Sequence, residues 1–578
     1  MINNASPLLM ADWYKVSHIS MYHKDTEFLQ SNLTPRSDRL YPHFVDDDHS
    51  VMFAGIQGFI KWFFVEMFEN NFFHVPKEEA LKPYKEACNM AIGEGKVDFS
   101  GFERLHDLGY LPLEIRALPE GILSPVGVPV YTIQNTVSGF AWLVNYFESA
   151  MSAETWKTTT TATTSYQYNK LCHKFAELTC DNKEHVPFQC HMFAFRGQAG
   201  MADAAQSEFG HLMNFTGTDT IPSIWYANKY YNMEGKFVAA SVPATEHSVA
   251  TTNISYIMED ENSESSNVFL SKDVRRGIAE MQFIKELITE NYPTGFISYV
   301  ADSYDYFKVI TEILPCLKEE IMNRDGKLII RPDSGVPENI IAGYRWSGVE
   351  YNSQYEVPYD HEAGTLRSEV IKVNGNFYKF EQADTLAVCK NRGLTKNYVK
   401  LMDYPHITEH EVKGSIEILW ETFGGEVNSK GYKVLDSHIG LIYGDSITVK
   451  RAEDIFKRLE EKGFASSNVV YGVGSYTTQY VTRDSLGFAV KATGAVIGGK
   501  DIMVSKEPKT DMGKRSAKGF LKVVKGNETG ELRTVPVDSL EKVQEEDNEL
   551  RVIFKDGQLI VDETLETIRE RVQDNFRK

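Results

Sequence analysis

Three aspartates follow short apolar runs and could meet in one site. Asp302, Asp333 and Asp445 each stand near the end of a run expected to be a strand. Carboxylates placed this way suit holding a divalent cation with its waters, or accepting hydrogen bonds from sugar hydroxyls. The structural alternative is that they cap the following helices, Asp333 above all, and that Arg331 only pairs with it. The repeated placement favours a functional site. The motifs are FISYVADSYD (296–305), KLIIRPDSG (327–335) and IGLIYGDS (439–446).

Glycines and cations further along the chain indicate a phosphate site. The stretch YGVGSY (471–476) leaves backbone N–H groups open at an expected strand end, although Gly-x-Gly alone is a weak signal. Arg483 and Lys491 follow, and residues 506–525 hold seven Lys or Arg against two acids. In a chain of net charge −20 such a positive island can focus a polyanion; the alternative is a solvated basic loop. These features predict a site for a phosphorylated sugar carrying further phosphate, with hydrolases, kinases and transferases all open.

Glu246 and His247 stand side by side in SVPATEHSV (241–249). A carboxylate–imidazole pair can perform acid–base or nucleophilic chemistry. Adjacent side chains usually point different ways, so a solvated surface pair is the alternative on the pair alone.

The elements that must position these residues change character along the chain. The segment 58–68 is apolar around most of its circumference and predicts a buried helix, and 111–135 predicts a β-rich region. The run TTTTATTS (158–165) suits either a strand or a helix. From about residue 188, apolar runs alternate with helical periodicity, as in AEDIFKRLEEKGF (452–464), which predicts parallel strands whose carboxyl ends share one site. Residues 336–438 break this rhythm and predict an inserted α+β element.

Composition excludes several classes of protein. A chain of 578 residues with 42% apolar residues is long enough for two to four globular domains. Its negative charge argues against nucleic acid and acidic membranes as partners. The cysteines have no zinc-site spacing, and neither a signal segment nor a membrane span is apparent, so a cytoplasmic protein with reduced thiols is expected. The cysteines are Cys88, Cys172, Cys180, Cys190, Cys316 and Cys389.

Ten motifs occur in the order found in the nicotinamide phosphoribosyltransferases, and the chain closely resembles that family over nearly its whole length. They are DWYKVSH (12–18), LPLEIRALPEG (111–121), FAFRG (193–197), NFTGTDT (214–220), SVPATEHS (241–248), ADSYD (301–305), IIRPDSG (329–335), YGDS (443–446), VTRD (481–484) and DMGKRSAKG (511–519). The resemblance implies an α/β fold of two domains. An irregular β/α barrel of the type II phosphoribosyltransferase kind (151–499, with the insertion) accompanies an α+β domain formed by 1–150 and about 500–578.

The resemblance also implies a reaction and a pocket for its acceptor. The enzyme would be a homodimer with shared active sites, transferring 5-phosphoribosyl from phosphoribosyl pyrophosphate to nicotinamide and giving nicotinamide mononucleotide and pyrophosphate. Phe193 and Tyr14, the latter from the second subunit, would stack on the pyridine ring. Asp219 would accept from the carboxamide NH2 and so disfavour nicotinate, and Arg331 would lie near the carboxamide oxygen. Further expected pocket residues are Arg196, Ser241, Val242, Ala244 and Ser298.

The resemblance also implies which residues bind the phosphoribosyl group and which residue reacts with ATP. Asp333, Gly444 and Asp445 would contact ribose hydroxyls, while Asp302 and Asp333 would face Mg2+ and the pyrophosphate. ATP, as co-substrate, would phosphorylate His247. The 5-phosphate would be bound by Gly474 and Ser475, and the basic rim would comprise Arg36, Arg483, Lys491, Lys506 and Lys514. A nicotinate phosphoribosyltransferase and a noncatalytic nucleotide-binding protein on the same fold are the alternatives.

The chain departs from the family pattern in three places. GVGSY has Ser475 and Tyr476 where glycines are expected, Arg36 lies in a poorly matching LTPRSDR, and residues 336–438 are longer than expected.

Overall fold

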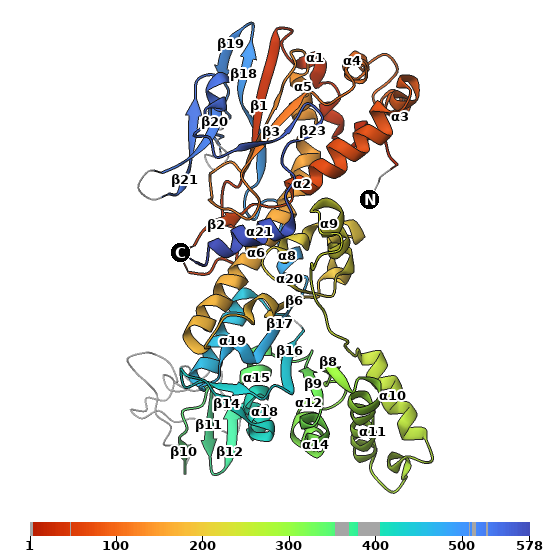
Figure 1. Ribbon diagram of the computed structural model, residues 1–578, viewed down its shortest axis with the longest axis vertical. Helices are drawn as coiled ribbons and strands as arrows, with labels where there is room; N and C mark the ends of the chain where they lie inside the picture. Colours follow the sequence, from red (N-terminus) through yellow and green to blue (C-terminus); the bar gives the residue numbers. More distant parts are fainter. Residues whose placement is uncertain are drawn as a thin grey trace, which may run out of the picture. The chain divides into compact units, whose positions relative to one another are not determined.

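The computed structural model describes residues 4–46, 48–352, 369–379, 405–444, 446–507, 509–510, 516–526 and 530–577. The chain forms two compact units (Figure 1). Unit 1 comprises Met1–Lys170, Met192–Ala239 and Ser475–Lys578, and unit 2 comprises Leu171–His191 and Ala240–Gly474.

Unit 1 is built around a seven-stranded antiparallel sheet to which both ends of the chain contribute (Figure 1). Buried Leu33, Ile115, Ile133 and Phe554 supply part of its core. The β-rich prediction for 111–135 is confirmed, since that region holds three strands. In spatial order the sheet is β19 (Lys500–Met503), β18 (Ala489–Ile497), β1 (Thr26–Thr34), β5 (Tyr131–Asn135), β3 (Leu113–Ala117), β22 (Arg551–Lys555) and β23 (Gln558–Leu559).

Two helices of this part of the chain test predictions made from the sequence, one for residues 58–68 and one for the threonine run 158–165. The predicted buried helix is confirmed: α2 (Ile56–Phe59) continues as a helix through Ile60–Met67, and Phe63 and Phe64 are buried. The threonine run is helical and belongs to α6 (Glu148–Thr179), where its hydroxyls are satisfied by donating to the carbonyl one turn earlier, as Thr163 does to Thr159.

The remaining elements of unit 1 are α1 (His18–Met21), α3 (Lys77–Ala91), α4 (Ser100–Leu108), α5 (Ala141–Tyr146), α7 (Met201–Ser207), α8 (Phe209–Leu212), α9 (Ile221–Tyr230), α20 (Tyr476–Gln479), α21 (Leu565–Asp574), β2 (Ser50–Met52), β4 (Leu123–Pro125), β7 (Gly217–Thr218), β20 (Phe520–Lys525) and β21 (Leu532–Val537).

Unit 2 is a β/α half-barrel whose strands β17 (Val469–Val473), β16 (Ile439–Tyr443), β9 (Asp325–Arg331) and β8 (Thr294–Val300) lie in that order and run parallel. The crossover helix predicted over 452–464 is α19 (Val449–Glu461), with Ile455 and Leu459 buried. Parallel pairing puts the carboxyl ends of all four strands at one edge. The other elements are β6 (Cys190–Met192), α10 (His247–Glu259), α11 (Lys272–Glu286), α12 (Tyr306–Lys308), α13 (Leu314–Cys316), α14 (Lys318–Met322), α15 (Pro337–Ala342), α17 (Glu409–Lys413), α18 (Ser415–Phe423), β14 (Gly425–Val427) and β15 (Lys433–Leu435).

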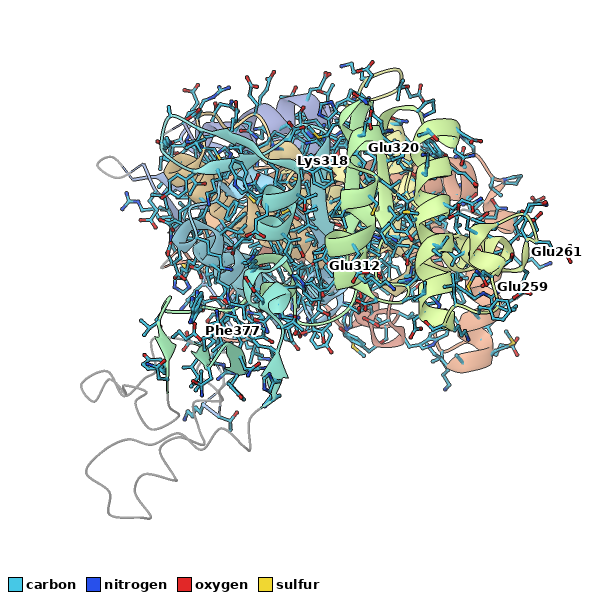
Figure 2. The ribbon with its side chains drawn as sticks, turned by 90° about the horizontal axis from the view of Figure 1, so that it is seen from below. Glu259, Glu261, Glu312, Lys318, Glu320 and Phe377 are labelled. Atoms are coloured by element: carbon cyan, nitrogen blue, oxygen red, sulfur yellow. The ribbon has the colours of Figure 1, made fainter. Side chains whose placement is uncertain are left out.

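The described part of 336–438 contains a small sheet of β10 (Glu350–Tyr351), β11 (Val370–Val373), β12 (Asn376–Lys379) and β13 (His406–Ile407). Figure 2 shows Phe377 in this sheet. Strands β11 and β12 form a hairpin, because Asn374 and Gly375 both adopt positive φ and form its turn. Glu369 anchors it by accepting from both terminal nitrogens of the buried Arg458, at 2.9 and 2.7 Å.

No helix within the described ranges is long and apolar enough to cross a membrane.

Candidate functional site

Two of the three predicted aspartates meet at the carboxyl edge of the half-barrel. Val300 and Arg331, the last residues of β8 and β9, pair in register, so Asp302 and Asp333 follow at equivalent positions. The backbone N–H of Asp333 donates to Asp302 Oδ2 at 3.0 Å. Asp302 is nearly buried, with 4% of its side chain exposed, whereas Asp333 is 39% exposed. One carboxylate is thus held by the backbone and the other faces solvent.

Gly444 completes this edge at the end of β16. A Cβ on Gly444 would lie 2.9 Å from Asp333 Oδ1, so glycine leaves room for that carboxylate. Asp445, the third predicted aspartate, lies outside the described residues. Gly474 follows β17 at the same edge of the parallel strands.

The segment before α10 runs alongside β8 and carries His247 to the same edge. Thr245 N–H donates to Ser298 O, and Ser298 N–H donates to Pro243 O, both at 2.9 Å. Ala244 forms a parallel bridge with Ser298. Ser241, Val242 and Ala244, predicted to shape the pocket wall, belong to this segment.

His247 is the first residue of α10, and its ring faces the two acids rather than Glu246. Its Nε2 lies 3.6 Å from Asp302 Oδ1 and 3.9 Å from Asp333 Oδ2, and its Nδ1 lies 3.1 Å from the Ser303 hydroxyl. Glu246 instead accepts a hydrogen bond from the hydroxyl of Ser248. The acids beside His247 are therefore Asp302 and Asp333 from the strand ends, whereas Glu246, its neighbour in the sequence, pairs with Ser248.

Several buried polar atoms around this cluster lack a hydrogen-bond partner among the described residues. They include Asp302 Oδ1, Arg331 Nε and Ser298 Oγ. Arg331 is oriented by a hydrogen bond from Nη2 to Thr245 O at 2.8 Å. Because an unsatisfied buried polar atom costs about 1–3 kcal/mol, such a concentration is typical of a site that binds a polar ligand.

The described residues contain no group of three or more His, Cys, Asp or Glu able to hold a metal ion by themselves. Asp302 and Asp333 nevertheless fit Mg2+, which commonly takes one or two carboxylates and completes its shell with waters and substrate phosphates. The unpartnered Asp302 Oδ1 is a suitable oxygen donor.

Three of the residues predicted to bind the acceptor, Phe193, Arg196 and Asp219, lie in unit 1. Phe193 follows β6 and is partly buried, and Arg196 lies in the short turn Phe195–Gly197. The N–H of Asp219 donates to Met192 O at 3.0 Å, which places exposed Asp219 beside the strand that ends just before Phe193. The backbone thus brings Phe193 and Asp219 into neighbouring positions.

Other residues of unit 1 belong to the predicted phosphate rim. Ser475 packs closely on the turn that carries Arg196, because a Cβ on Gly197 would lie 2.5 Å from that of Ser475. Arg36 Nε donates to Gly487 O at 3.0 Å, and Arg483 pairs with Asp484 at 2.9 Å. Lys491 pairs with Glu148 at 3.2 Å, Lys506 is exposed, and Lys514 lies outside the described residues.

Tyr14 is 61% exposed, and Lys15 Nζ lies 5.1 Å from its ring centroid. An exposed aromatic face on a short turn is available for stacking against a ligand.

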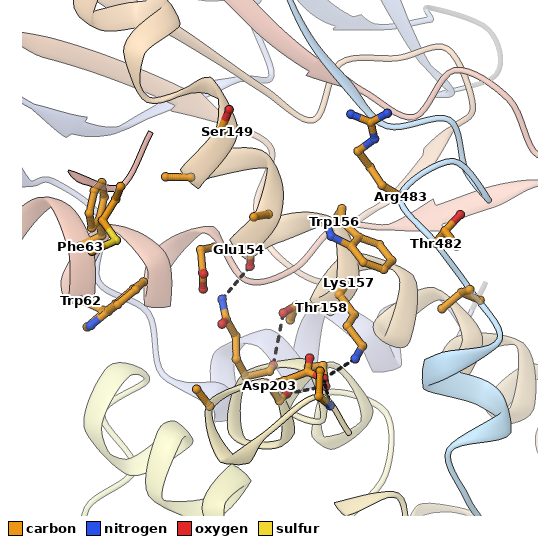
Figure 3. A pocket seen from close by; sticks show the side chains of 18 of the residues that line it. Trp62, Phe63, Ser149, Glu154, Trp156, Lys157, Thr158, Asp203, Thr482 and Arg483 are labelled. Carbon is orange, nitrogen blue, oxygen red and sulfur yellow. Dashed lines mark hydrogen bonds and ion pairs between the residues drawn. The ribbon is translucent and has the colours of Figure 1, made fainter. Parts of the chain in front are cut away.

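A cavity of about 770 Å3 in unit 1 includes Arg483 in its wall (Figure 3). Lys157 and Asp203 form an ion pair in its wall. Glu154 also lines the cavity, and burial raises the pKa of its carboxyl. Sequence reasoning did not select these three residues, and only the proximity of Asp203 to FAFRG in the chain could have drawn attention to one of them.

Comparisons with known proteins identify the family of this chain. The model of the Nicotinate phosphoribosyltransferase (NAPRTase) family matches residues 188–558. A nicotinamide phosphoribosyltransferase of Acinetobacter baylyi is 39% identical over 98% of this chain and 97% of its own. One of Mycoplasma pneumoniae is 30% identical over 89% of this chain and 94% of its own. A nicotinate-nucleotide pyrophosphorylase structure from Pyrococcus furiosus is 13% identical, covers 100% of this chain and 97% of its own, and superposes with a TM-score of 0.48.

A half-barrel with acids at its strand ends, taken with these matches, defines a pentosyltransferase. The chain belongs to the NAPRTase family, and its close resemblance to relatives of that family is confirmed over nearly the full length.

Proposed function

We propose that this enzyme transfers 5-phosphoribosyl from phosphoribosyl pyrophosphate to the ring nitrogen of nicotinamide, within NAD salvage. The observation that carries the proposal is the cluster of His247, Asp302 and Asp333 at the carboxyl edge of the half-barrel. The similarity to enzymes named nicotinamide phosphoribosyltransferase supports the choice of acceptor.

Departure of pyrophosphate is the step in which the site must stabilise the most developing charge. As the bond from the anomeric carbon to pyrophosphate breaks, positive charge develops on the sugar and negative charge on the leaving oxygen. Asp302 and Asp333 would hold Mg2+, which supplies positive charge to the pyrophosphate. Asp333, together with Gly444 and Asp445, would orient the ribose hydroxyls. Removing one such contact is expected to cost about 10²–10³ in rate.

Acceptor choice rests on Asp219. A carboxylate beside the amide of nicotinamide gains a charge-assisted hydrogen bond, whereas beside nicotinate it meets a like charge. Phe193 would stack on the ring, and Tyr14 of a second copy would cover the other face, which makes the functional assembly a homodimer. Tyr14 is exposed and so accessible to such a role.

ATP coupling would run through His247. An imidazole nitrogen attacks the γ-phosphorus, an N–P bond forms, and the P–O bond to ADP breaks. The ring is positively charged until its remaining N–H proton is lost, and the carboxylates at 3.6 and 3.9 Å stabilise that charge. Hydrolysis of the phosphohistidine during each cycle would favour nucleotide synthesis.

The test incubates the purified protein with phosphoribosyl pyrophosphate, Mg2+ and either base, with and without ATP, and follows mononucleotide and pyrophosphate. The proposal expects nicotinamide mononucleotide, a stimulation by ATP and a requirement for Mg2+. Faster turnover of nicotinate would instead support the alternative that the name of the family suggests. Absence of product from both bases would favour the noncatalytic alternative.

Assembly and location need separate measurements. Sedimentation at several protein concentrations tests the dimer. A cytoplasmic location is supported by the free thiols of the five described cysteines, and cell fractionation tests it.

A further inference from the structure

Gln198 occupies the centre of a hydrogen-bond cluster in unit 1, outside the residues given a role above. Its Nε2 donates to Thr478 Oγ1 at 2.8 Å and to Glu208 Oε1 at 3.4 Å. Its Oε1 accepts from Gln479 Nε2 at 2.8 Å and from Lys157 Nζ at 3.0 Å. The four partners come from α6, from α20 and from the junction between α7 and α8.

This environment specifies a primary amide. An amide offers two N–H donors and an oxygen with two lone pairs, and Gln198 uses all four. The opposite orientation would set its NH2 group against the ammonium of Lys157. A carboxylate at this position would face the carboxyl of Glu208, and an apolar side chain would remove one hydrogen bond from each of the four partners.

The cluster joins two segments that serve different substrates in the proposed reaction. Gln198 directly follows Gly197, the end of the segment that carries Phe193 and Arg196. Thr478 and Gln479 belong to α20, which begins immediately after Ser475. The same segments touch where Gly197 packs on Ser475. The amide therefore connects residues 193–197, proposed to bind the acceptor and called here the acceptor-binding segment, to Gly474 and Ser475, proposed to bind the 5-phosphate and called the phosphate loop.

Glu208, the carboxyl partner of Gln198, is buried close to charged neighbours. It is 1% exposed, and burial raises its pKa to about 7 against the lowering effects of the Thr220 hydroxyl and the Gln198 amide. Asp203 raises this pKa and Lys157 lowers it. Thr220 is buried and directly follows Asp219. Glu208 is thus a deeply buried carboxyl partner of Gln198.

We propose that Gln198 is a positioning residue that makes the phosphate loop and the acceptor-binding segment a single support. This inference rests on the proposed function. When the support is broken, both segments lose their fixed geometry, and both substrates bind more weakly. Loss of a catalytic group would instead lower kcat with little effect on either KM.

The test uses the full-length enzyme and three variants at Gln198 and Glu208. Gln198→Leu removes the four bonds at similar volume, and KM for nicotinamide and for phosphoribosyl pyrophosphate should both rise about tenfold, with a smaller change in kcat. Gln198→Glu should be impaired in the same way. Adding Glu208→Gln to it should restore both KM values, because the amide at 208 then donates to the carboxylate at 198.

A matched control is Gln206→Leu. Gln206 belongs to the same cavity wall but donates to a backbone carbonyl, that of Glu154, at 2.6 Å. It should leave both KM values unchanged. Thermal melting of every variant separates a general loss of stability from a change in substrate binding.

The positioning role is refuted if Gln198→Leu leaves both KM values at the wild-type level, or if the double variant is no better than Gln198→Glu. Failure of the proposed function is visible separately, as absence of product with the wild-type enzyme. In that case calorimetric binding of inorganic pyrophosphate and of nicotinamide decides: the inference requires weaker binding of both to Gln198→Leu, and unchanged binding of either overturns it.

Discussion

Replacement of Asp302 by Asn tests the electrostatic basis of the phosphohistidine proposal. The substitution removes the charge and keeps an oxygen that can accept from the Asp333 N–H, a bond of 3.0 Å in the native protein. The geometry of the strand ends should therefore persist, and the substitution removes negative charge both beside the imidazole ring and from the carboxylate pair proposed to hold Mg2+.

The size of the effect follows from distance and exposure. Two unit charges 3.6 Å apart, the separation of His247 Nε2 and Asp302 Oδ1, interact by about 4–5 kcal/mol at an effective dielectric constant of about 20. The His247 side chain is 48% exposed, so solvent screening reduces this to about 2 kcal/mol. Phosphorylation of His247 should then slow by about 30-fold.

The assay measures incorporation of the γ-phosphate of ATP into the protein as an acid-labile, alkali-stable adduct. His247→Asn gives the background, and Ser303→Ala, which removes only the hydroxyl near Nδ1, is the matched control with a smaller expected effect. If Asp302→Asn is phosphorylated as fast as the native enzyme, the carboxylate has no part in activating or stabilising His247, and this reasoning is wrong.

Three further substitutions test other parts of the molecule. Asp219→Asn should lower the ratio of kcat/KM for nicotinamide over nicotinate, and an unchanged ratio would remove Asp219 from the selectivity argument. Gly444→Ala should displace the Asp333 carboxylate and lower kcat/KM about 10²-fold at nearly native melting temperature, whereas native activity would contradict the close approach. Burial raises the pKa of Glu280 to about 7, so the protonated carboxyl stabilises the fold at acid pH, and this stabilisation of about 3 kcal/mol is lost as pH rises from about 4.5 through 7. Urea unfolding should therefore show that Glu280→Gln, which keeps an acceptor for Tyr299, becomes more stable relative to the native protein over that window. Parallel curves of unfolding free energy against pH for the two proteins would contradict this.

The parallel strands and their polar ends were readable from the sequence because both are local patterns. Apolar runs that end in Asp302 and Asp333 predict where those residues lie once the strands pair in register. The turn of the hairpin at 370–379 is likewise a local pattern, because Asn374–Gly375 is a strong turn signal. The helical state of the threonine run could not be predicted, because these threonines are buried and composition alone does not specify the packing around them.

The sequence did not predict which residues, distant in the chain, contact His247 and Gln198. Adjacency in the sequence could not decide whether Glu246 orients His247, and in the structure His247 faces Asp302 and Asp333. Helix geometry explains this, because Glu246 is the N-cap residue, in extended conformation, and its carboxylate accepts from Ser248 while the His247 ring projects from the first turn. Gln198 carried no signal at all, since its importance arises only from the four groups that surround it.

Ser475 and Tyr476, which replace expected glycines, are each accommodated by a compensating feature. Ser475 can carry a side chain because Gly197, which packs against it, has no Cβ; any larger residue at 197 would collide with it at 2.5 Å. Tyr476 begins α20 and stacks on Tyr480, with centroids 4.4 Å apart and planes inclined by 7°. The loop thus exchanges the conformational freedom of glycine for side-chain packing.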